Sequence, residues 1–441
     1  MSTCGRYVLV GSGVAGFSAA EAIRENDETA DITMIGDEPH GFYSRPGLAY
    51  LLSGEISQRL LFPFDEQDYR KLDIQRLRAR AVRIDPSAHT LSLDDHTSLP
   101  YDRLLIVTGA EAVRPAVGGV DLQGVVKLDN LEDACQILKR VGSANVAVVV
   151  GGGITALEIV EALTTRKVHT HYFLRGDRYW SNVLVEDESR LVERRLQERG
   201  VEIHFNTELA EIVGEGGRVA GVRTKKNQLI QCEMVGIAIG IQPRKELAEV
   251  SGIKTERGIL VDEYLQTSAP NIYAAGDVAQ VFDSLTGQYN LDSLWNTARQ
   301  QGRAAGLNMS GQPFLYQKEL SFNVTRLAGL TTTIIGRVGG GRDADMVGIA
   351  RGDSESWRQH TDAVVIQNNS DAGRLRIQVG GQVLVGAVIM GDQAFSAPLE
   401  GLIANRVDIT PIREKILQPG APVGELVAEY WYRWEESIHA A

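Results

Sequence analysis

The sequence predicts an α/β fold with two parallel-sheet domains, followed by a C-terminal α+β domain. Two observations carry this prediction. The order strand, glycine-rich turn, helix, strand occurs at residues 6–36 and again at residues 146–173. This βαβ order implies parallel strands joined by right-handed crossovers. Past Pro313 the pattern changes to β-branched segments bounded by turns, which indicate an antiparallel sheet.

Length and composition limit the possible functions. The chain has 441 residues, long enough for two or three domains with separate cores. Its net charge of −12 argues against general binding to nucleic acid or anionic membranes, because both need a positive surface. No apolar run reaches the roughly 18 to 20 residues that span a bilayer, and the N-terminus carries no signal segment. We therefore expect a cytoplasmic protein without a membrane span.

The first βαβ unit begins with the apolar strand RYVLV, continues into the helical pattern FSAAEAIREN and reaches a second strand in DITMIGDE. Between residues 74 and 105, three segments indicate hairpin strands and then a strand that returns to the sheet. These segments are LRARAVRID, HTLSLDD and YDRLLIVTGA.

The second βαβ unit begins at Val146. HTHYFLRG is expected to be its second strand, and ESRLVERRLQERG a helix with apolar residues at helical spacing. Further strands are expected at VEIHF, RVAGVRT and MVGIAIG. NIYAAGDVAQ indicates a buried strand that enters a turn.

The C-terminal part carries four segments typical of an antiparallel sheet, LTTTIIGRV, DAVVIQNN, GRLRIQV and QVLVGAVIM, with the glycine-rich loop GRVGGGRDAD between the first two. A final helix, ELVAEYWYRWEESI, has an apolar stripe on one face. The stripe consists of Leu426, Val427, Tyr430, Trp431 and Trp434. Such a stripe usually packs on the core, with docking of a partner as the alternative.

The first glycine turn predicts a dinucleotide site. Gly11, Gly13 and Gly16 form the pattern GxGxxG between a strand and a helix. The first glycine allows the tight turn, the second lets the backbone approach a pyrophosphate, and the third lets helix and strand pack closely. The diphosphate then lies on the N–H groups at the positive end of the helix. Asp37 and Glu38 follow about 25 residues further on and offer a carboxylate for the ribose hydroxyls.

The second turn repeats the pattern with one change. Gly151 and Gly153 match, and Ala156 stands at the third position, where a methyl group widens the contact between helix and strand slightly. A turn that serves only to reverse the chain is the alternative. Two dinucleotide sites in one chain are explained if one binds a hydride carrier and the other binds a second redox cofactor, because the two must lie face to face for hydride transfer.

Two further motifs are VTGA at Val107–Ala110 and NIYAAGD, which ends at Asp277. With all four motifs the sequence resembles the pyridine nucleotide-disulfide oxidoreductases, which are flavoproteins with two dinucleotide-binding domains. The resemblance implies two Rossmann-like domains, for FAD and NAD(P), and a C-terminal interface domain. The expected boundaries are 1–113 with 244–312 for the FAD-binding domain, 114–243 for the NAD(P)-binding domain and 313–441 for the interface domain.

The motifs and the resemblance together assign single residues. Those expected to hold FAD are Gly11, Gly13, Ala15, Gly16, Asp37, Glu38, Arg45, Pro46, Ala81, Val82, Thr108, Gly109, Gly276 and Asp277. By the resemblance, Ala81 and Val82 line the adenine, and Thr108 and Gly109 close over the diphosphate. Those expected to hold the nicotinamide nucleotide are Gly151, Gly153, Ile154, Glu158, Arg175, Arg178 and Gly240. Arg45 and Glu158 are the candidate catalytic residues, with Glu158 beside the nicotinamide.

The stretch HGFYSRPGLAYLLSGE narrows the resemblance. Disulfide reductases carry a redox cysteine pair here, and related peroxidases and oxidases a single cysteine, but this chain has Arg45 and Pro46. Electrons therefore cannot pass through a thiolate at this place. The stretch resembles the rubredoxin reductases and the flavoprotein part of assimilatory nitrite reductases. It is more distantly similar to the ferredoxin reductases of oxygenase systems, which usually have a lysine where Tyr50 stands.

Arg45 has two possible roles. It either braces its loop on a carboxylate, or its guanidinium lies near the flavin and stabilises the negative charge of the reduced ring. The three cysteines, Cys4, Cys135 and Cys232, form no short-spaced pair, so the sequence predicts neither a disulfide scaffold nor a local dithiol.

The second nucleotide site favours NADPH. NAD-specific sites place a carboxylate at the end of the second strand, where it accepts the ribose 2′-hydroxyl. In HYFLRGDRYW this place falls at Leu174, followed by Arg175 and Arg178. Two arginines suit a 2′-phosphate, so we predict NADP(H) rather than NAD(H). Asp177 is the residue that could reverse the preference by turning inward.

His169 and His171 alternate on one expected strand and share a face. Two ligands are too few for zinc, and the other histidines are scattered along the sequence. We therefore expect a surface or packing role for this pair and no metal site.

Together these observations predict an FAD-dependent enzyme that takes a hydride from NAD(P)H and passes the electrons to a small electron-transfer protein, such as a rubredoxin or ferredoxin. FAD suits this task because it accepts two electrons together and can release them singly. An NAD(P)H oxidase or quinone reductase with a small-molecule acceptor is the alternative enzyme. A redox-sensing or structural subunit of a larger complex is the alternative of another class, and a homodimer is the expected assembly of the chain alone.

Overall fold

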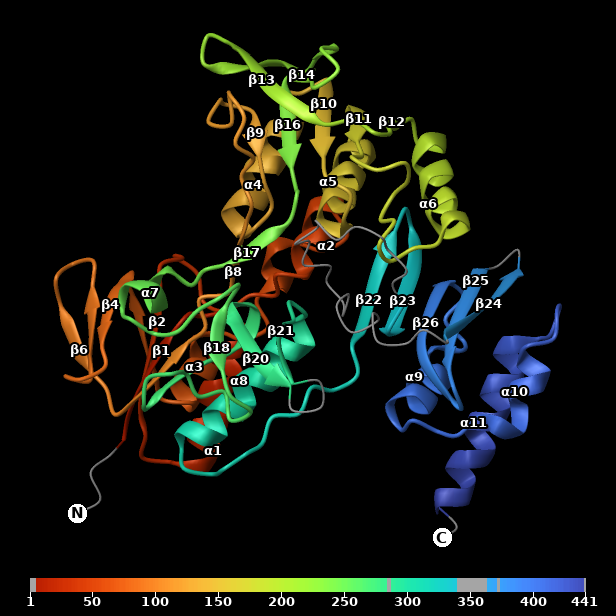
Figure 1. Cartoon of the computed structure of the whole chain (residues 1–441). Coiled ribbons are helices and arrows are strands. Elements are labelled where there is room, and N and C mark those ends of the chain that lie inside the picture. Colours follow the sequence, from red (N-terminus) through yellow and green to blue (C-terminus); the bar gives the residue numbers. More distant parts are fainter. Residues whose placement is uncertain (1–4, 284–286, 339–362, 371–372, 440–441) are drawn as a thin grey trace. The chain divides into compact units, whose positions relative to one another are not determined.

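The computed structural model of the chain describes residues 5–283, 287–338, 363–370 and 373–439 (Figure 1). The chain divides into two compact units. The first consists of Met1–Val113, Leu128–Ile137 and Gly240–Lys318, and the second of Arg114–Lys127, Leu138–Ile239 and Glu319–Ala441. The finer division into three domains stays a prediction. Among the described residues, no helix combines the length and the apolar character that crossing a membrane requires.

A five-stranded parallel sheet with the order β19-β7-β1-β2-β3 forms the centre of the first unit. Its strands are β1 (Arg6–Val10), β2 (Asp31–Gly36), β3 (Ile74–Arg78), β7 (Arg103–Ile106) and β19 (Ile272–Ala274). Helix α1 (Val14–Asn26) connects β1 to β2 and packs against α8 (Trp295–Met309). A Cβ on Gly302 of α8 would lie 2.1 Å from the carbonyl oxygen of Ala15, so this glycine lets the two helices touch. The first predicted βαβ unit is therefore confirmed.

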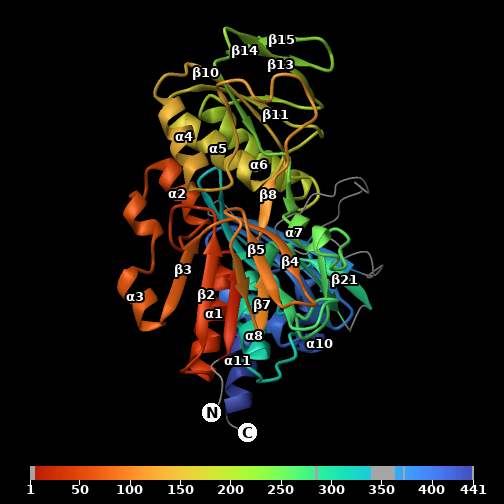
Figure 2. The same ribbon diagram turned by 90° about the vertical axis from the view of Figure 1, so that its left-hand side faces the viewer.

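The prediction that hairpin strands begin at about residue 74 was wrong, and Leu77 and Arg78 at the start of LRARAVRID belong to another strand. Residues 74–78 do not belong to the hairpin strands, because they pair in parallel with β2 as the edge strand β3 (Figure 2). The antiparallel strands are β4 (Ala81–Asp85), β5 (Thr90–Leu93) and β6 (Ser98–Pro100). Alternation of apolar and polar residues is the same in an exposed parallel edge strand and in a hairpin, so the pattern alone did not separate them.

Shorter elements complete the first unit. Its remaining strands are β8 (Ala110–Ala112), β17 (Ile241–Pro243), β18 (Ile259–Val261), β20 (Ala279–Asp283) and β21 (Gln288–Leu291). Its remaining helices are α2 (Gly47–Ser53), η1 (Gln58–Leu61), α3 (Glu66–Lys71), α7 (Glu246–Val250) and η2 (Gly276–Val278). The segment 128–137 contains the start of α4 (Leu131–Val141). The strand and turn predicted at NIYAAGD are confirmed as β19 and η2.

The second unit contains the second predicted βαβ unit, in a parallel sheet with the order β12-β11-β10-β16-β9. Its strands are β9 (Val125–Val126), β10 (Val146–Val150), β11 (His169–Phe173), β12 (Glu202–His204) and β16 (Met234–Ile237). Helix α5 (Ile154–Thr165) connects β10 to β11, and α6 (Glu186–Glu198) connects β11 to β12. A small antiparallel sheet packs on one face through Val148, Phe173 and Ile212. Its strands are β13 (Leu209–Glu215), β14 (Arg218–Thr224) and β15 (Leu229–Gln231).

The predicted C-terminal antiparallel sheet has the order β22-β23-β26-β25-β24. Its strands are β22 (Phe322–Leu327), β23 (Leu330–Gly336), β24 (Ala363–Ser370), β25 (Gly373–Gly380) and β26 (Val383–Gly391), followed by α9 (Ser396–Ala404), α10 (Thr410–Ile416) and α11 (Val423–His439). The stripe on α11 packs on this core, and its Val427 is fully buried, so the core role is confirmed. Most of GRVGGGRDAD lies outside the described residues.

Candidate functional site

The two glycine turns have the same geometry, one in each unit. Gly11 has a φ of 131° and Gly151 a φ of 144°. A Cβ on Gly11 would lie 2.1 Å from the carbonyl oxygen of Val107, and a Cβ on Gly151 would lie 2.0 Å from that of Ala238. Val107 and Ala238 each follow the neighbouring parallel strand. Only glycine fits at either position, and each turn leads the chain sharply from a strand into a helix.

The second glycine of each turn leaves room for a phosphate. Gly13 and Gly153 are the N-caps of α1 and α5, and neither helix end is capped by a side chain. A Cβ added to either glycine meets no atom within 4 Å. The first N–H groups of both helices therefore remain available for an anion, which fits the diphosphate of a dinucleotide.

The third position explains the difference between the two turns. A Cβ on Gly16 would lie 2.2 Å from the carbonyl oxygen of Gly11, so the first turn requires glycine here too. At the second turn Ala156 is fully buried, and its methyl group is accommodated between helix and strand. The substitution predicted to widen this contact therefore leaves the fold of the turn intact.

Residues predicted to bind FAD gather at the carboxyl ends of β1, β7 and β19. The N–H of Gly276 donates to Gln301 Oε1 at 2.8 Å, and Ala15 lies against Gly276. Thr108 Oγ1 donates to the carbonyl oxygen of Arg244 at 2.7 Å, and the N–H of Arg244 donates to the carbonyl oxygen of Gly109 at 2.9 Å. Gln301 and Arg244 were missed by the sequence analysis, since neither stands in a motif.

Other predicted FAD residues lie on separate elements. Ala81 and Val82 begin β4, where a register shift between Ala81 and Arg83 leaves the Val82 side chain 43% exposed. An exposed apolar side chain suits contact with an adenine ring, but that contact stays a prediction. Asp277 stands in η2 directly after Gly276, and Pro46 is the N-cap of α2.

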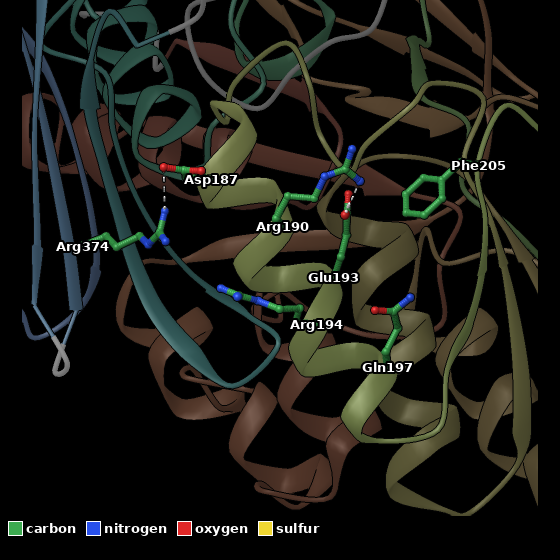
Figure 3. A pocket seen from close by; sticks show the side chains of 7 residues that line it. All are labelled: Asp187, Arg190, Glu193, Arg194, Gln197, Phe205 and Arg374. Carbon is green, nitrogen blue, oxygen red and sulfur yellow. Dashed lines mark hydrogen bonds and ion pairs between the residues drawn. The ribbon is translucent and has the colours of Figure 1, made fainter.

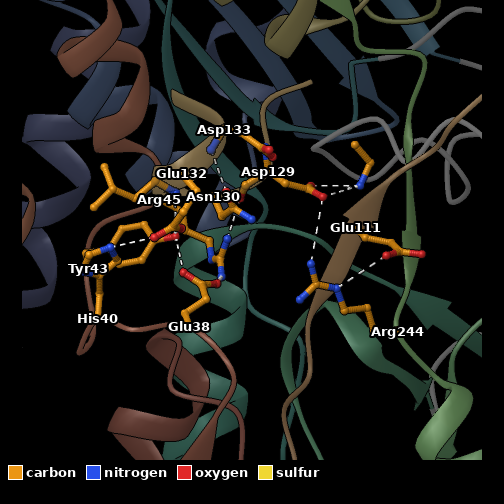
Figure 4. Close-up of polar contacts among 12 residues, drawn as sticks. Glu38, His40, Tyr43, Arg45, Glu111, Asp129, Asn130, Glu132, Asp133 and Arg244 are labelled. Carbon is orange, nitrogen blue, oxygen red and sulfur yellow. Dashed lines mark hydrogen bonds and ion pairs between the residues drawn. The ribbon is translucent and has the colours of Figure 1, made fainter. Parts of the chain in front are cut away.

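A polar network follows the end of β2 (Figure 4). Tyr43 donates its hydroxyl hydrogen to Glu38 Oε2 at 2.7 Å, and the Arg45 guanidinium pairs with Glu38 Oε1. Arg45 also donates to the carbonyl oxygen of Asp129. Burial raises the pKa of Tyr43 far above its usual value, so its hydroxyl stays protonated and keeps donating to Glu38.

The network ties the segment 38–45 to the segment 129–132. The N–H of Leu131 donates to the Tyr43 hydroxyl at 3.1 Å, and His40 Nε2 lies 2.7 Å from Glu132 Oε1. The bracing contact considered for Arg45 is therefore present. Both Glu38 oxygens already accept a hydrogen bond, although each retains a second acceptor site. Ribose binding by Glu38 or by the exposed Asp37, and a role of Arg45 toward flavin, stay predictions.

The end of β11 has the residues that the NADPH prediction requires. Leu174, at the place of the NAD-specific carboxylate, is buried, and Arg175 is exposed. Arg178 Nη1 lies 3.6 Å from a carboxylate oxygen of Asp177, whose side chain is 68% exposed. Asp177 thus faces Arg178 and solvent, and does not take the buried position of Leu174.

The loop that carries Arg175 and Arg178 is held by buried polar groups. Tyr179 donates its N–H to Glu193 Oε1 at 2.7 Å, and Ser189 Oγ donates to the carbonyl oxygen of Tyr179 at 2.6 Å. Arg376, on β25, donates to the carbonyl oxygen of Val183 at 2.9 Å. The anchor at Arg376 was missed by the sequence analysis, because its contact with Val183 joins residues 193 positions apart in the chain.

The other residues predicted to bind the nicotinamide nucleotide surround α5. Ile154 is its first residue and is buried, and Glu158 follows one turn later in a half-buried position. Burial raises the pKa of Tyr179 well above its usual value, and the negative charge of Glu158 contributes to the shift. Gly240 has a φ of 126°, and a Cβ on it would meet no atom within 4 Å.

A pocket in the second unit lies along α6 (Figure 3). It is lined by Asp187, Arg190, Glu193, Arg194, Gln197, Phe205 and Arg374. No predicted site residue lines it. Two of its arginines have acidic partners, since Arg190 pairs with Glu193 at 2.8 Å and Arg374 with Asp187 at 3.7 Å. We therefore assign no function to this pocket.

Cys232 is poorly suited to redox catalysis. Cys232 is buried, and burial raises the pKa of its thiol to about 12, so it carries no thiolate at neutral pH. Cys135 is exposed, and Cys4 lies outside the described residues.

Comparisons with known proteins identify the family. Residues 5–302 match the model of the pyridine nucleotide-disulphide oxidoreductases. Rhodocoxin reductase of Rhodococcus erythropolis is 32% identical over 335 residues, which cover 74% of this chain and 78% of that protein. An NADH oxidase of Methanocaldococcus jannaschii is 31% identical over 337 residues, 74% of each protein.

Structural similarity extends over nearly the whole chain. A ferredoxin reductase of Rhodopseudomonas palustris superposes with a TM-score of 0.84 over 96% of this chain and 100% of that chain, which shows a shared fold at a sequence identity of 23%. The predicted fold class, family and cofactors are thus confirmed. The chain belongs to the pyridine nucleotide-disulphide oxidoreductase family and is an FAD-dependent NAD(P)H oxidoreductase.

Proposed function

We propose that this enzyme uses NADPH to reduce a small electron-transfer protein of the rubredoxin or ferredoxin type, through FAD and without a thiol relay. One observation carries the proposal: Arg45 and Pro46 stand where disulfide reductases carry their redox cysteines. Cys232 offers no substitute, because its thiol is buried and protonated. When bound, FAD supplies the conversion between two-electron and one-electron transfer.

The chain itself contributes binding and orientation. The turn at Gly11 and Gly13 presents the uncapped start of α1 to the FAD diphosphate, and the turn at Gly151 and Gly153 presents the start of α5 to the nicotinamide nucleotide. Arg45, held by Glu38 and by the carbonyl oxygen of Asp129, supplies a fixed positive charge for the reduced flavin. No acid or base side chain is needed for hydride transfer.

The preference for NADPH rests on the end of β11. A buried Leu174 replaces the carboxylate that would bind a 2′-hydroxyl, and the exposed Arg175 and half-buried Arg178 offer donors to a 2′-phosphate. Steady-state kinetics with both nucleotides tests this preference. We expect a lower KM for NADPH, and equal KM values for NADPH and NADH would contradict it.

The acceptor class is supported by the relatives. A rhodocoxin reductase and a ferredoxin reductase are similar to this chain, and their names describe reduction of small redox proteins. We also propose a homodimer, which light scattering would detect. The aromatic stripe of α11 packs on the core of its own chain, with only Val427 fully buried.

Anaerobic stopped-flow absorbance separates the possible functions. Mixing the oxidised holoenzyme with NADPH should bleach the flavin band quickly, and adding rubredoxin or ferredoxin should restore it quickly. The variant Cys4→Ser/Cys135→Ser/Cys232→Ser should keep both rates. Slow bleaching would favour a redox sensor, and loss of either rate in the cysteine-free variant would show that electrons do pass through sulfur.

A second candidate function is an NAD(P)H oxidase, because the Methanocaldococcus jannaschii relative carries that name at 31% identity. In the same experiment, the reduced enzyme is mixed with air-saturated buffer instead of a redox protein. Reoxidation faster than by rubredoxin and ferredoxin would favour the oxidase. Slow reoxidation by dioxygen is the result that we expect.

A further inference from the structure

Four possible metal ligands lie together on two neighbouring strands of the second unit. His169 and His171 are on β11, and Glu202 and His204 are on β12, the edge strand (Figure 1). The parallel register pairs His171 with Glu202, and Phe173 with His204. Residues two apart on a strand share a face, so all four side chains lie on the same face of the sheet. The two ligands found in the sequence thus become four.

The distances between these side chains are short. Glu202 Oε1 lies 2.9 Å from His169 Nε2, and Glu202 Oε2 lies 3.2 Å from His171 Nδ1. His171 Nδ1 also lies 3.0 Å from His204 Nε2. Ligand atoms of His169, His171 and Glu202 all lie within 4.8 Å of one another. With zinc–ligand bonds of about 2.0–2.2 Å, a tetrahedral site needs ligand atoms about 3.4 Å apart. His169, His171 and Glu202 are the three residues that already lie near this spacing, and His204 is the candidate fourth ligand through its contact with His171.

Hydrogen bonds alone do not satisfy this cluster well. The Nδ1 atom of a neutral His171 carries either one hydrogen or one lone pair. If Nδ1 carries the hydrogen, this single N–H has to donate to both Glu202 Oε2 and the lone pair of His204 Nε2. With the lone pair, it can accept from His204 but then faces the carboxylate of Glu202 without a hydrogen between them. A cation at the centre satisfies all of these lone pairs together.

We propose that His169, His171, Glu202 and His204 form a tetrahedral site for a divalent transition-metal ion, with Zn²⁺ as its cation. Imidazole and carboxylate are ligands that zinc prefers, and four protein ligands make a closed, structural site. The bound ion fastens the three-residue edge strand β12 to β11. This site lies outside the proposed electron-transfer function and does not depend on it.

The site is open enough to load from solution. The side chains of His169 and Glu202 are 46% and 53% exposed, and His171 is 13% exposed. Substitution of the two exposed ligands should therefore leave the metal-free fold unchanged. His40→Gln provides a matched control, because His40 makes a similar pair with one carboxylate, Glu132, at 2.7 Å in the other unit.

The test is zinc binding by the full-length holoenzyme, purified without a polyhistidine tag and stripped with a chelator that is then removed. Isothermal titration with Zn²⁺ gives the stoichiometry and Kd, and X-ray absorption at the zinc edge gives the ligand types. We expect one zinc ion per chain, nitrogen and oxygen ligands without sulfur, and a higher melting temperature with zinc.

The variants His169→Gln and Glu202→Gln should each weaken zinc binding by at least about tenfold, since even changes behind the ligands of a metal site cost about 10- to 100-fold. Their melting temperatures without zinc should equal that of the parent, which shows that they fold. His40→Gln should bind zinc like the parent. No stoichiometric zinc binding by the parent, equal Kd values in parent and ligand variants, or loss of binding in His40→Gln would overturn the proposal.

Discussion

The buried ion pair between Arg376 and Glu188 allows a quantitative prediction for the second unit. The two side chains are 3% and 4% exposed. Arg376 donates to Glu188 from Nε at 2.8 Å and from Nη2 at 3.2 Å, and to the carbonyl oxygens of Val338 and Val183 at 2.8 and 2.9 Å. The substitution Arg376→Met removes all four hydrogen bonds and leaves the Glu188 carboxylate buried without its counter-charge.

The expected loss of stability is about 3 kcal/mol. Removing one partner of a buried pair costs about 3–5 kcal/mol. Glu188 keeps the hydrogen bond from the N–H of Val185 at 3.0 Å and stays in the first turn of α6, which stabilises a negative charge, so we take the lower value. With a urea m-value of about 3 kcal/mol/M, the unfolding midpoint falls by about 1 M.

The assay is urea unfolding of the full chain, followed by the fluorescence of tryptophans such as the buried Trp180 in the second unit. The double variant Arg376→Met/Glu188→Met should regain most of the loss, because apolar residues can replace a buried ion pair at little cost. A midpoint within about 0.3 M of the parent for Arg376→Met, or a double variant less stable than the single one, would refute the reasoning.

Three further predictions concern the nucleotide sites and the thiols. Arg175→Ala should raise the KM for NADPH about tenfold and change the KM for NADH by less than about twofold, because the variant loses one phosphate contact worth about 1.4 kcal/mol. An equal rise in the KM values of both nucleotides would contradict this prediction. Gly13→Val should raise the Kd for FAD, measured by flavin fluorescence, at least about tenfold. The control Gly142→Ala, at an exposed position, should leave this Kd unchanged. Equal Kd values for Gly13→Val and the parent would disprove the diphosphate site. Iodoacetamide at pH 8 should label the exposed Cys135 in the native protein. Cys232, whose thiol has a pKa of about 12, should be labelled only after unfolding. If mass spectrometry finds both cysteines labelled in the native protein, the burial of Cys232 is disproved.

The parts of the site that the sequence predicted are those whose requirements are local. Gly11 and Gly151 are needed because a Cβ would meet a backbone carbonyl oxygen at about 2 Å, and the glycine pattern shows this need directly. Arg175 and Arg178 after β11 were predicted for the same reason, since they stand at a fixed place after a strand, and their contact with the nucleotide stays a prediction. The wrong prediction that the hairpin begins at Ile74 shows the limit of such local patterns. Alternation of apolar and polar residues indicates a strand but does not tell which strand it pairs with.

The parts that the sequence did not predict depend on contacts between distant residues. Arg376 reaches the carbonyl oxygen of Val183 from almost two hundred residues away, and no pattern near either residue indicates the contact. Glu202 and His204 join His169 and His171 only because β12 pairs with β11 in one particular register. Register follows from the whole sheet and the connecting helix, so these neighbours had no signal in the sequence.

The position of β19 has a consequence for synthesis of the chain. β19 pairs with β7 through residues 272–274 and 104–106, so the order of the sheet places a late strand beside an early one. At about 5 to 20 residues per second, a ribosome needs about 10 to 30 s to reach β19 after it has made β7. During this interval the apolar strand RLLI has an unpaired edge that can pair with other chains. Newly made chains are therefore most prone to aggregate while the residues between β7 and β19, which include the parallel sheet of the second unit, are still being translated.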